Sequence, residues 1–237
     1  MSLLDNLISY WKLDESSGNA SDETANNNDL TNQNSVAYSA AKINNGADFV
    51  SANSKYLTKV SAANLPLGAS ARTFSLWFKS PDAGSLVNYT FLMYGTGSSK
   101  ALQWFAFGND GGGNRGVAWN GYASDLFRAY AFAANTWYHI VGTFDGTNAR
   151  VYINGSLQGS AEDHSDWNTS GATLSLGRSE QSGGTYYLNG SLDEVGIWSR
   201  ALSSDDVLEL YNSGDGLQYP FSVAPSFSRA PTMLNVF

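Results

Sequence analysis

Aromatic, amide and charged side chains gather in two predicted loop regions, and together they could bind a sugar. A sugar site needs aromatic surface for the C–H faces of the ring, and amides or carboxylates for its hydroxyl groups. The turn formers Asn120-Gly121 should hold Trp119 and Tyr122 near a loop tip, where core packing is less available. Because Trp and Tyr are also frequent in sandwich strands and cores, packing is the alternative role. The wider set of such residues also contains Trp104, Asn109, Arg178, Tyr186 and Tyr187. The candidate carbohydrate-binding residues chosen from it are Asp110, Arg115, Trp119, Asn120, Tyr122 and Trp167.

The elements that must position these side chains are β-strands, most clearly over residues 136–160. Hydrophobic side chains alternate there with residues of the other face, which is the two-residue period of a strand. Turn formers interrupt the pattern at 145–148, and Asn154-Gly155 favours a type I′ hairpin. The stretch therefore predicts three consecutive antiparallel strands. Together with a later strand, it predicts that six side chains are buried: Ile140, Phe144, Val151, Ile153, Val195 and Ile197.

The end of the chain differs from the rest in composition. A helix is predicted over 204–212, with Ser203 as its N-cap and Gly214 ending it. Residues 216–237 carry three of the five prolines, one charge (Arg229) and many apolar side chains. This composition indicates an extended segment with a contact surface rather than a disordered linker. We expect a domain over 1–215 and an arm over 216–237, with 217–237 docking on another protein chain in a homo-oligomer or larger assembly; folding back on its own domain is the alternative.

Composition narrows the class of protein. The 237 residues are 42% apolar and 14% aromatic, enough for the core of one large all-β domain. Only 14% are charged and the net charge is −8, which argues against nucleic acid and disfavours anionic membranes. The absence of cysteine excludes disulfides, thiolate chemistry and cysteine-bound zinc. The first residues lack the features of a signal peptide, and no apolar run predicts a membrane span.

Several segments, taken in order, resemble laminin-G-like domains of the concanavalin A-like lectin/glucanase superfamily, which includes the pentraxins. The central match is WYHIVGTFDG at 137–146 with VYING at 151–155. FSLWFK at 74–79 and LNGSLDEVGIW at 188–198 match an earlier strand and the closing segment. The resemblance spans about residues 7–213 and implies a two-sheet antiparallel jelly-roll sandwich with one short C-terminal helix and an extended tail.

Because this superfamily includes glucanases, catalysis needs a separate test. A retaining glycosidase needs two carboxylates about 5–5.5 Å apart, supplied on one strand by the pattern Glu-x-Asp-x-x-Glu. No segment of the sequence matches this pattern, and Asp193 and Glu194 are adjacent, so they should point to opposite faces. His139 lies within a strand among large side chains and is interpreted as a packing residue. We therefore expect no enzymatic activity.

Asp193 shares a strand face with Val195 and Ile197 and should lie at the edge of the core. A buried carboxylate must be hydrogen-bonded, paired or bound to a metal. One interpretation is a hydrogen bond that holds a loop. The resemblance implies another, a structural Ca²⁺, for which Asp193, Asp22 and Asp48 are the predicted ligands and Asp14 a further candidate.

The sequence thus predicts a non-catalytic, lectin-like binding module that recognises a glycan or a surface, outside a cell or on a virion. The alternative is a purely structural virion or surface-decoration protein that acts through protein–protein contacts. Neither hypothesis involves nucleic acid or insertion into a membrane.

Overall fold

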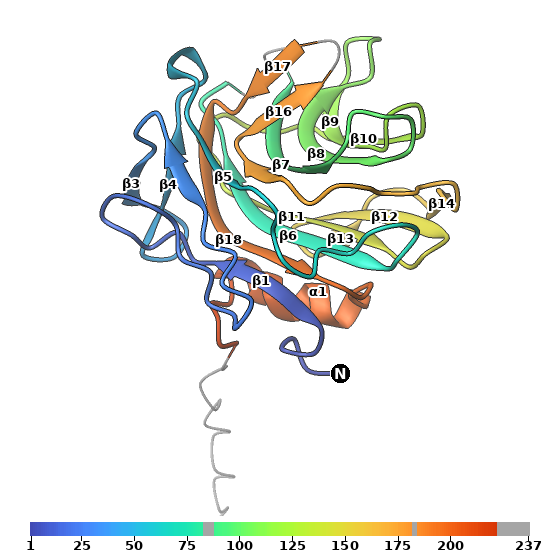
Figure 1. Cartoon of the computed structure of the whole chain (residues 1–237), viewed down its shortest axis with the longest axis horizontal. Coiled ribbons are helices and arrows are strands. Elements are labelled where there is room, and N and C mark those ends of the chain that lie inside the picture. Colours follow the sequence, from blue (N-terminus) through green and yellow to red (C-terminus); the bar gives the residue numbers. More distant parts are fainter. Residues whose placement is uncertain (83–87, 182–183, 222–237) are drawn as a thin grey trace, which may run out of the picture.

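Two antiparallel sheets pack face to face and form a jelly-roll sandwich (Figure 1). The structure is a computed structural model that describes residues 1–82, 88–181 and 184–221. The predicted fold class is therefore confirmed, with a short helix following the last strand. Within the described ranges, no helix has the length and apolar character needed to cross a lipid bilayer.

The first sheet has nine strands within the described residues. Its main order is β13 (Ser156–Leu157), β12 (Asn148–Ile153), β11 (Tyr138–Phe144), β6 (Arg72–Lys79), β18 (Gly190–Trp198), β4 (Asn45–Phe49) and β3 (Ala37–Ala40), while β1 (Leu7–Trp11) also pairs with β18 and β14 (Glu162–Asp163) with β12.

The second sheet has seven strands in the same part of the chain. Their order is β10 (Asp125–Ala129), β9 (Arg115–Asn120), β8 (Leu102–Asn109), β7 (Tyr89–Gly95), β15 (Leu174–Leu176), β5 (Tyr56–Lys59) and β2 (Thr31–Gln33). A separate hairpin is formed by β16 (Arg178–Gln181) and β17 (Gly184–Tyr187).

The three-strand meander predicted over 136–160 corresponds to β11, β12 and β13. Ile140 lies opposite Ile153 in the β11–β12 register. Asn154 and Gly155 connect β12 to β13 with φ values of 50° and 76°, the left-handed pair that a type I′ turn requires. The turn chemistry read from the sequence therefore sets the strand register.

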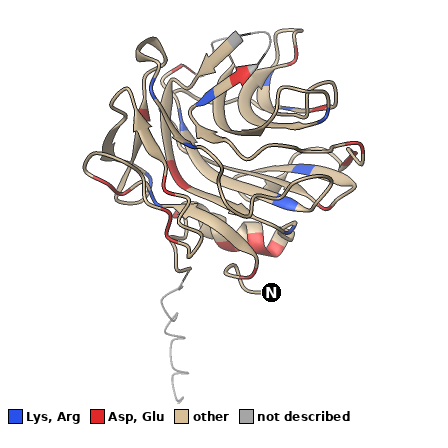
Figure 2. Cartoon of the chain, viewed as in Figure 1, with Lys and Arg blue, Asp and Glu red and all other residues tan. Residues whose placement is uncertain are grey.

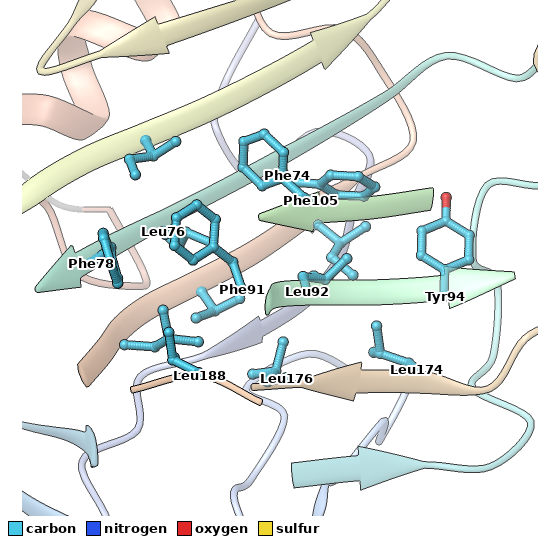
Figure 3. Packing of buried hydrophobic residues seen from close by; sticks show 14 of the residues in the cluster. Phe74, Leu76, Phe78, Phe91, Leu92, Tyr94, Phe105, Leu174, Leu176 and Leu188 are labelled. Atoms are coloured by element: carbon cyan, nitrogen blue, oxygen red, sulfur yellow. The ribbon is translucent and has the colours of Figure 1, made fainter. Parts of the chain in front are cut away.

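The main core lies between the two sheets (Figure 3). Rings from β6 meet rings from the opposite sheet, with Phe78 4.6 Å from Phe91 and Phe74 5.1 Å from Trp119 between ring centroids. The predicted burial is confirmed, because the exposed fraction is at most 1% for each of the six: Ile140, Phe144, Val151, Ile153, Val195 and Ile197.

A second apolar cluster covers the outer face of the nine-stranded sheet. Helix α1 (Ser204–Tyr211) begins at the predicted N-cap Ser203, where the Ser203 and Asp206 side chains form a capping box. The helix packs Val207 and Leu210 into this cluster. His139, on the same face, is buried 5.2 Å from the Trp77 ring, in agreement with a packing role.

The beginning of the predicted arm belongs to this cluster rather than to a contact with another chain. Leu217 and Phe221 are buried, and the Phe221 ring lies 5.1 Å from Tyr10 and 6.2 Å from Trp198. Residues 217–221 thus follow the alternative in which the arm folds back on its own domain, because the outer face of β1 and β18 supplies the apolar partner. Docking of the arm on another chain stays a prediction. The remainder of the arm, 222–237, lies outside the described residues.

Truncation of the paired β11–β12 side chains should strongly destabilise the fold. We expect Ile140→Ala and Ile153→Ala each to lower the free energy of unfolding by about 2–5 kcal/mol, because each leaves a cavity between the sheets. Denaturant melts measure this change, and Leu157→Ala on the exposed β13 edge is the control. Losses below about half a kcal/mol in both core variants would contradict the packing described here.

Candidate functional site

The outer face of the seven-stranded sheet contains a hollow of about 320 Å³. Residues of β8 and β9 alternate between the two faces, so Phe105 and Trp119 enter the core while Trp104 and Asn120, directly opposite each other, face outward. The residues that line the hollow come from β8, β9, the β9–β10 turn, the first position of β10 and the position just before β7: Asn88, Trp104, Ala106, Asn109, Ala118, Asn120, Tyr122, Ala123 and Asp125.

Small side chains make the floor of this hollow. Ala106 lies opposite Ala118, and Gly108 lies opposite Gly116 in the next outward-facing row. A Cβ atom on Gly108 would lie 3.0 Å from the Ala118 Cβ and 3.4 Å from Asn88 Oδ1. The sheet is hollow here because two neighbouring strands carry alanine and glycine where larger side chains would fill the surface.

Aromatic rings bound one side of the hollow. Trp104 and Tyr186 are stacked with their ring centroids 5.1 Å apart, and Tyr122 packs against the same cluster. Trp104 is only 6% exposed, and its indole N–H donates to Thr90 Oγ1 (2.9 Å). Tyr122 is half-buried and lines the hollow, whereas the half-buried Tyr186 stacks on Trp104 without being part of the lining.

Amides and one carboxylate supply the polar part of the lining. Asn88 Oδ1 accepts hydrogen bonds from the backbone N–H of Asn109 (3.3 Å) and from its Nδ2 (3.1 Å). Asn120 and Asp125 are paired residues at the adjacent ends of β9 and β10. The hollow therefore presents hydrogen-bond donors and acceptors next to aromatic surface.

The turn that carries Tyr122 has an uncommon backbone conformation. Tyr122 and Ala123 have φ values of 60° and 66°, and the N–H of Gly121 donates to the carbonyl of Ser124 (3.0 Å). Residues other than Gly, Asn and Asp seldom adopt these φ values, because they strain the backbone. Such strain persists only where neighbouring residues hold the conformation. The turn must therefore be held by neighbouring residues.

Two hydrogen bonds from other segments hold this turn. The N–H of Lys100 donates to the carbonyl of Tyr122 (2.8 Å), and the Trp167 indole N–H donates to the carbonyl of Ser124 (2.8 Å). Gly121 packs against the same indole, where a Cβ would lie 2.2 Å from its nitrogen. Trp167 thus supports the site from beneath it.

A polar network continues outward from the turn. The Ser124 hydroxyl donates to Asp166 (2.8 Å) and lies 3.0 Å from His164 Nδ1. Lys100 Nζ forms an ion pair with the same Asp166 carboxylate (2.8 Å). The Ser124 hydroxyl hydrogen is used in the hydrogen bond to Asp166. His164 Nδ1 must therefore be the protonated nitrogen that donates to Ser124 Oγ.

The predicted carbohydrate-binding residues are placed differently by the structure. Asn120 and Tyr122 line the hollow. Trp119 and Trp167 have no exposed surface, and their ring centroids lie 4.9 Å apart in the core. The expectation that these two rings face a ligand is wrong for this structure, because Trp119 is an inward-facing strand residue and Trp167 supports the turn.

The other two candidates lie away from the hollow. Asp110 binds its own loop, accepting from the N–H of Gly112 (2.8 Å) and from Asn114 Nδ2 (2.6 Å). The Arg115 guanidinium lies 4.2 Å from the Phe107 ring centroid, and the residue lines a separate hollow at one end of the sandwich.

Sequence reasoning did not select several residues of the lining. Trp104 and Asn109 belong to the wider set of sugar-binding candidates but were not chosen from it, although the alternation in residues 102–108 places Trp104 next to small side chains. Asn88 and Asp125 have no comparable signal, because each lies at a strand end and reaches the hollow only through sheet pairing.

The residues predicted to bind calcium do not share a site. In residues 1–82, 88–181 and 184–221, no three His, Cys, Asp or Glu side chains are arranged to hold a metal ion. Asp22 accepts backbone hydrogen bonds from Tyr10 (3.0 Å) and Asn28 (2.9 Å), whereas Asp48 accepts one from the Ser191 hydroxyl (2.6 Å). These contacts with the protein's own donors do not fit a shared calcium site.

Asp193 is fully buried, and one of its oxygens accepts a hydrogen bond from the N–H of Ile43 (2.8 Å). This contact agrees with the loop-holding interpretation. The neighbouring Glu194 has a φ of 50° and lies where the register between β18 and β6 shifts, so the expected strand alternation is broken at this position. Its carboxylate accepts from Tyr10 (2.6 Å) and Gln218 (2.7 Å). Burial raises the pKa of Asp193 to about 9 and that of Glu194 to about 8.

The sequence and the fold both resemble those of known proteins. The sequence profile of the concanavalin A-like lectin/glucanases superfamily matches residues 51–208. The chain belongs to this superfamily. No curated protein sequence is similar enough to this concanavalin A-like domain to count as a relative.

Solved structures share the fold of this concanavalin A-like domain. Domain 4 of AbnA, an extracellular arabinanase of Geobacillus stearothermophilus studied in complex with arabinotriose, matches with a TM-score of 0.68 and 20% identity over 86% of this chain and 97% of its own. The binding domain of Paraclostridial Mosquitocidal Protein 1 matches at 0.70 and 17%, covering 90% of this chain and 53% of its own. The binding domain of botulinum neurotoxin DC, in complex with rat synaptotagmin II, matches at 0.68 and 15%, covering 88% and 52%. The concanavalin A-like chain thus spans about half the length of these toxin binding domains.

The buried carboxyl pair should make the stability of this concanavalin A-like domain depend on pH. The ordinary pKa values are 3.8 for Asp193 and 4.5 for Glu194, so unfolding releases protons between these values and the raised folded-state values. The stability from the protonated pair is fully present below about pH 4 and is lost as pH rises through 8 to 9. Asp193→Asn keeps a neutral group of the same shape and should remove part of this loss.

Denaturant unfolding of both proteins at pH 5, 7 and 9 tests this prediction. The stability of Asp193→Asn relative to the natural sequence should increase with pH. Asp163→Asn, an exposed change, is the control and should show no such trend. A constant difference between Asp193→Asn and the natural sequence would contradict the assignment.

Proposed function

We propose that this chain is a non-catalytic, lectin-like module that binds a glycan through the hollow on the outer face of the seven-stranded sheet. The observation that carries the proposal is the lining itself. The half-buried Tyr122 ring and the edge of Trp104 stand beside amides and a carboxylate over a floor of small residues. This combination suits a sugar, whose C–H faces are apolar and whose hydroxyl groups both donate and accept hydrogen bonds.

The size and rigidity of the hollow support this proposal. Its volume of about 320 Å³ is at the lower end of the usual range for small-ligand sites, about 300–1,000 Å³. The floor belongs to paired strands, and the Tyr122 turn is held by Lys100 and Trp167. A preformed site loses little conformational entropy when it binds a ligand, which favours affinity.

The relatives in fold agree with a binding role without assigning one. The arabinanase domain has nearly the same extent as this chain, and its structure contains an oligosaccharide. The toxin relatives are binding domains as well. We propose that this module is displayed on the exterior of a cell or virion, where glycans are accessible.

A glycan panel with matched variants tests the proposal. The natural sequence should bind at least one glycan saturably. Asn120→Ala and Tyr122→Ala should each weaken that binding tenfold or more, about 1.4 kcal/mol. Alanine has a Cβ atom, as tyrosine does, so Tyr122→Ala leaves the strain of the left-handed backbone unchanged and removes only the ring. Trp119 is unsuitable for this test, because its truncation would damage the core.

Asn53→Ala is the matched control, since Asn53 is exposed in a 3₁₀ turn and is not part of the hollow. Binding that survives both site variants would place the site elsewhere. No saturable binding to any glycan would overturn the lectin proposal and favour a structural role through protein contacts.

A further inference from the structure

We infer that the glycan units held in this hollow are uncharged, so the module selects neutral sugars over sialylated or uronic-acid sugars. This inference rests on the proposed function and specifies the class of ligand for the same site. It follows from the charges of the side chains that line the hollow and of the side chains around it.

Among the residues that the structure describes, the lining of the hollow contains no cationic side chain. Its one charged residue in this part of the chain is Asp125, and its other polar side chains are the amides of Asn88, Asn109 and Asn120 and the hydroxyl of Tyr122. Carboxylate ligands are usually bound by Arg or Lys, often in bidentate pairs with Arg. A sugar carboxylate here would find amide donors and a like charge at Asp125 instead.

Two cationic side chains on segments that adjoin the turn, Lys100 and Arg128, are already bound to protein groups. Lys100 Nζ is paired with Asp166 at 2.8 Å. Arg128 on β10 is paired with Glu162 and donates to the carbonyl of Gln158 (2.7 Å). Turning either cation toward the hollow would break an ion pair.

Arg115 does not serve the hollow either, although it is a neighbour along β9. Residues 115, 117 and 119 face the other side of the sheet from Ala118 and Asn120, and the Arg115 guanidinium lies over Phe107. The sheet itself therefore separates this cation from the hollow.

The charge of the whole chain acts in the same direction. A net charge of −8 on few charged residues, scattered over the molecule in Figure 2, gives an acidic surface. Such a surface lowers the local concentration of anionic ligands. The carboxylate of Asp125 suits hydroxyl groups, which can donate to it, whereas a sugar carboxylate cannot at neutral pH.

Matched sugar pairs test this inference by isothermal titration at fixed ionic strength. The probes are galactose with galacturonate, glucose with glucuronate, and lactose with 3′-sialyllactose. For any pair whose neutral member binds, the charged member should bind at least tenfold more weakly. Asp125→Asn should narrow this difference, because it removes the like charge and keeps the shape. Asp163→Asn, a carboxylate on β14 that does not line the hollow, should leave the difference unchanged.

The outcomes separate this inference from the proposed function. Equal or tighter binding of a charged member, weakened by Asn120→Ala, would keep the lectin site and overturn the preference for neutral sugars. An unchanged difference in Asp125→Asn would also overturn it, since the discrimination would not arise from this lining. If these probes and the wider glycan panel give no saturable binding, the proposed function itself fails.

Discussion

The rest of the structure depends on the packing of one sheet against the other through aromatic rings on β6, β8 and β9. Phe74 lies within 6 Å of both Phe105 and Trp119, measured between ring centroids. These inward residues fix which side chains of β8 and β9 face outward, because alternate residues of a strand point to opposite faces. A one-residue slip in either strand would exchange the core with the hollow. The candidate site is therefore a direct consequence of the core.

The same packing supports the strained turn at the edge of the site. Trp167 lies between Trp119 and Phe144 in the core, and its indole nitrogen reaches the carbonyl of Ser124. Part of the energy of a left-handed Tyr122 is thus offset by contacts made deep in the sandwich. This connection explains how a loop residue can hold a fixed position beside the hollow.

Much of the fold could be predicted from the sequence, because its signals are local. Alternation around Ile140 and the turn chemistry of Asn154-Gly155 determine the meander without knowledge of distant residues. The candidate site could be predicted only in part. Of the predicted residues, Asn120 and Tyr122 line the hollow. The direction of Trp119 depends on which face of β9 meets the other sheet, and the turn signal at Asn120-Gly121 obscured that strand alternation.

The arm and the acidic residues also depend on contacts between distant segments, which the sequence does not reveal. The apolar character of residues 217–221 was clear, yet the sequence could not show that Tyr10 and Trp198, from the two ends of the chain, form the surface that they cover. Likewise, the pairing of Glu194 with Tyr10 and Gln218 depends on a register shift between β18 and β6, which no local sequence pattern indicates.

The central claim is that the hollow on the seven-stranded sheet is the ligand site. An NMR titration of labelled protein with the sugar that binds most tightly tests it most directly. We expect the largest chemical-shift changes at the side-chain amides of Asn88, Asn109 and Asn120 and at the Trp104 indole N–H. Changes confined to another surface, such as the 110–114 loop, with these four groups unaffected, would contradict it.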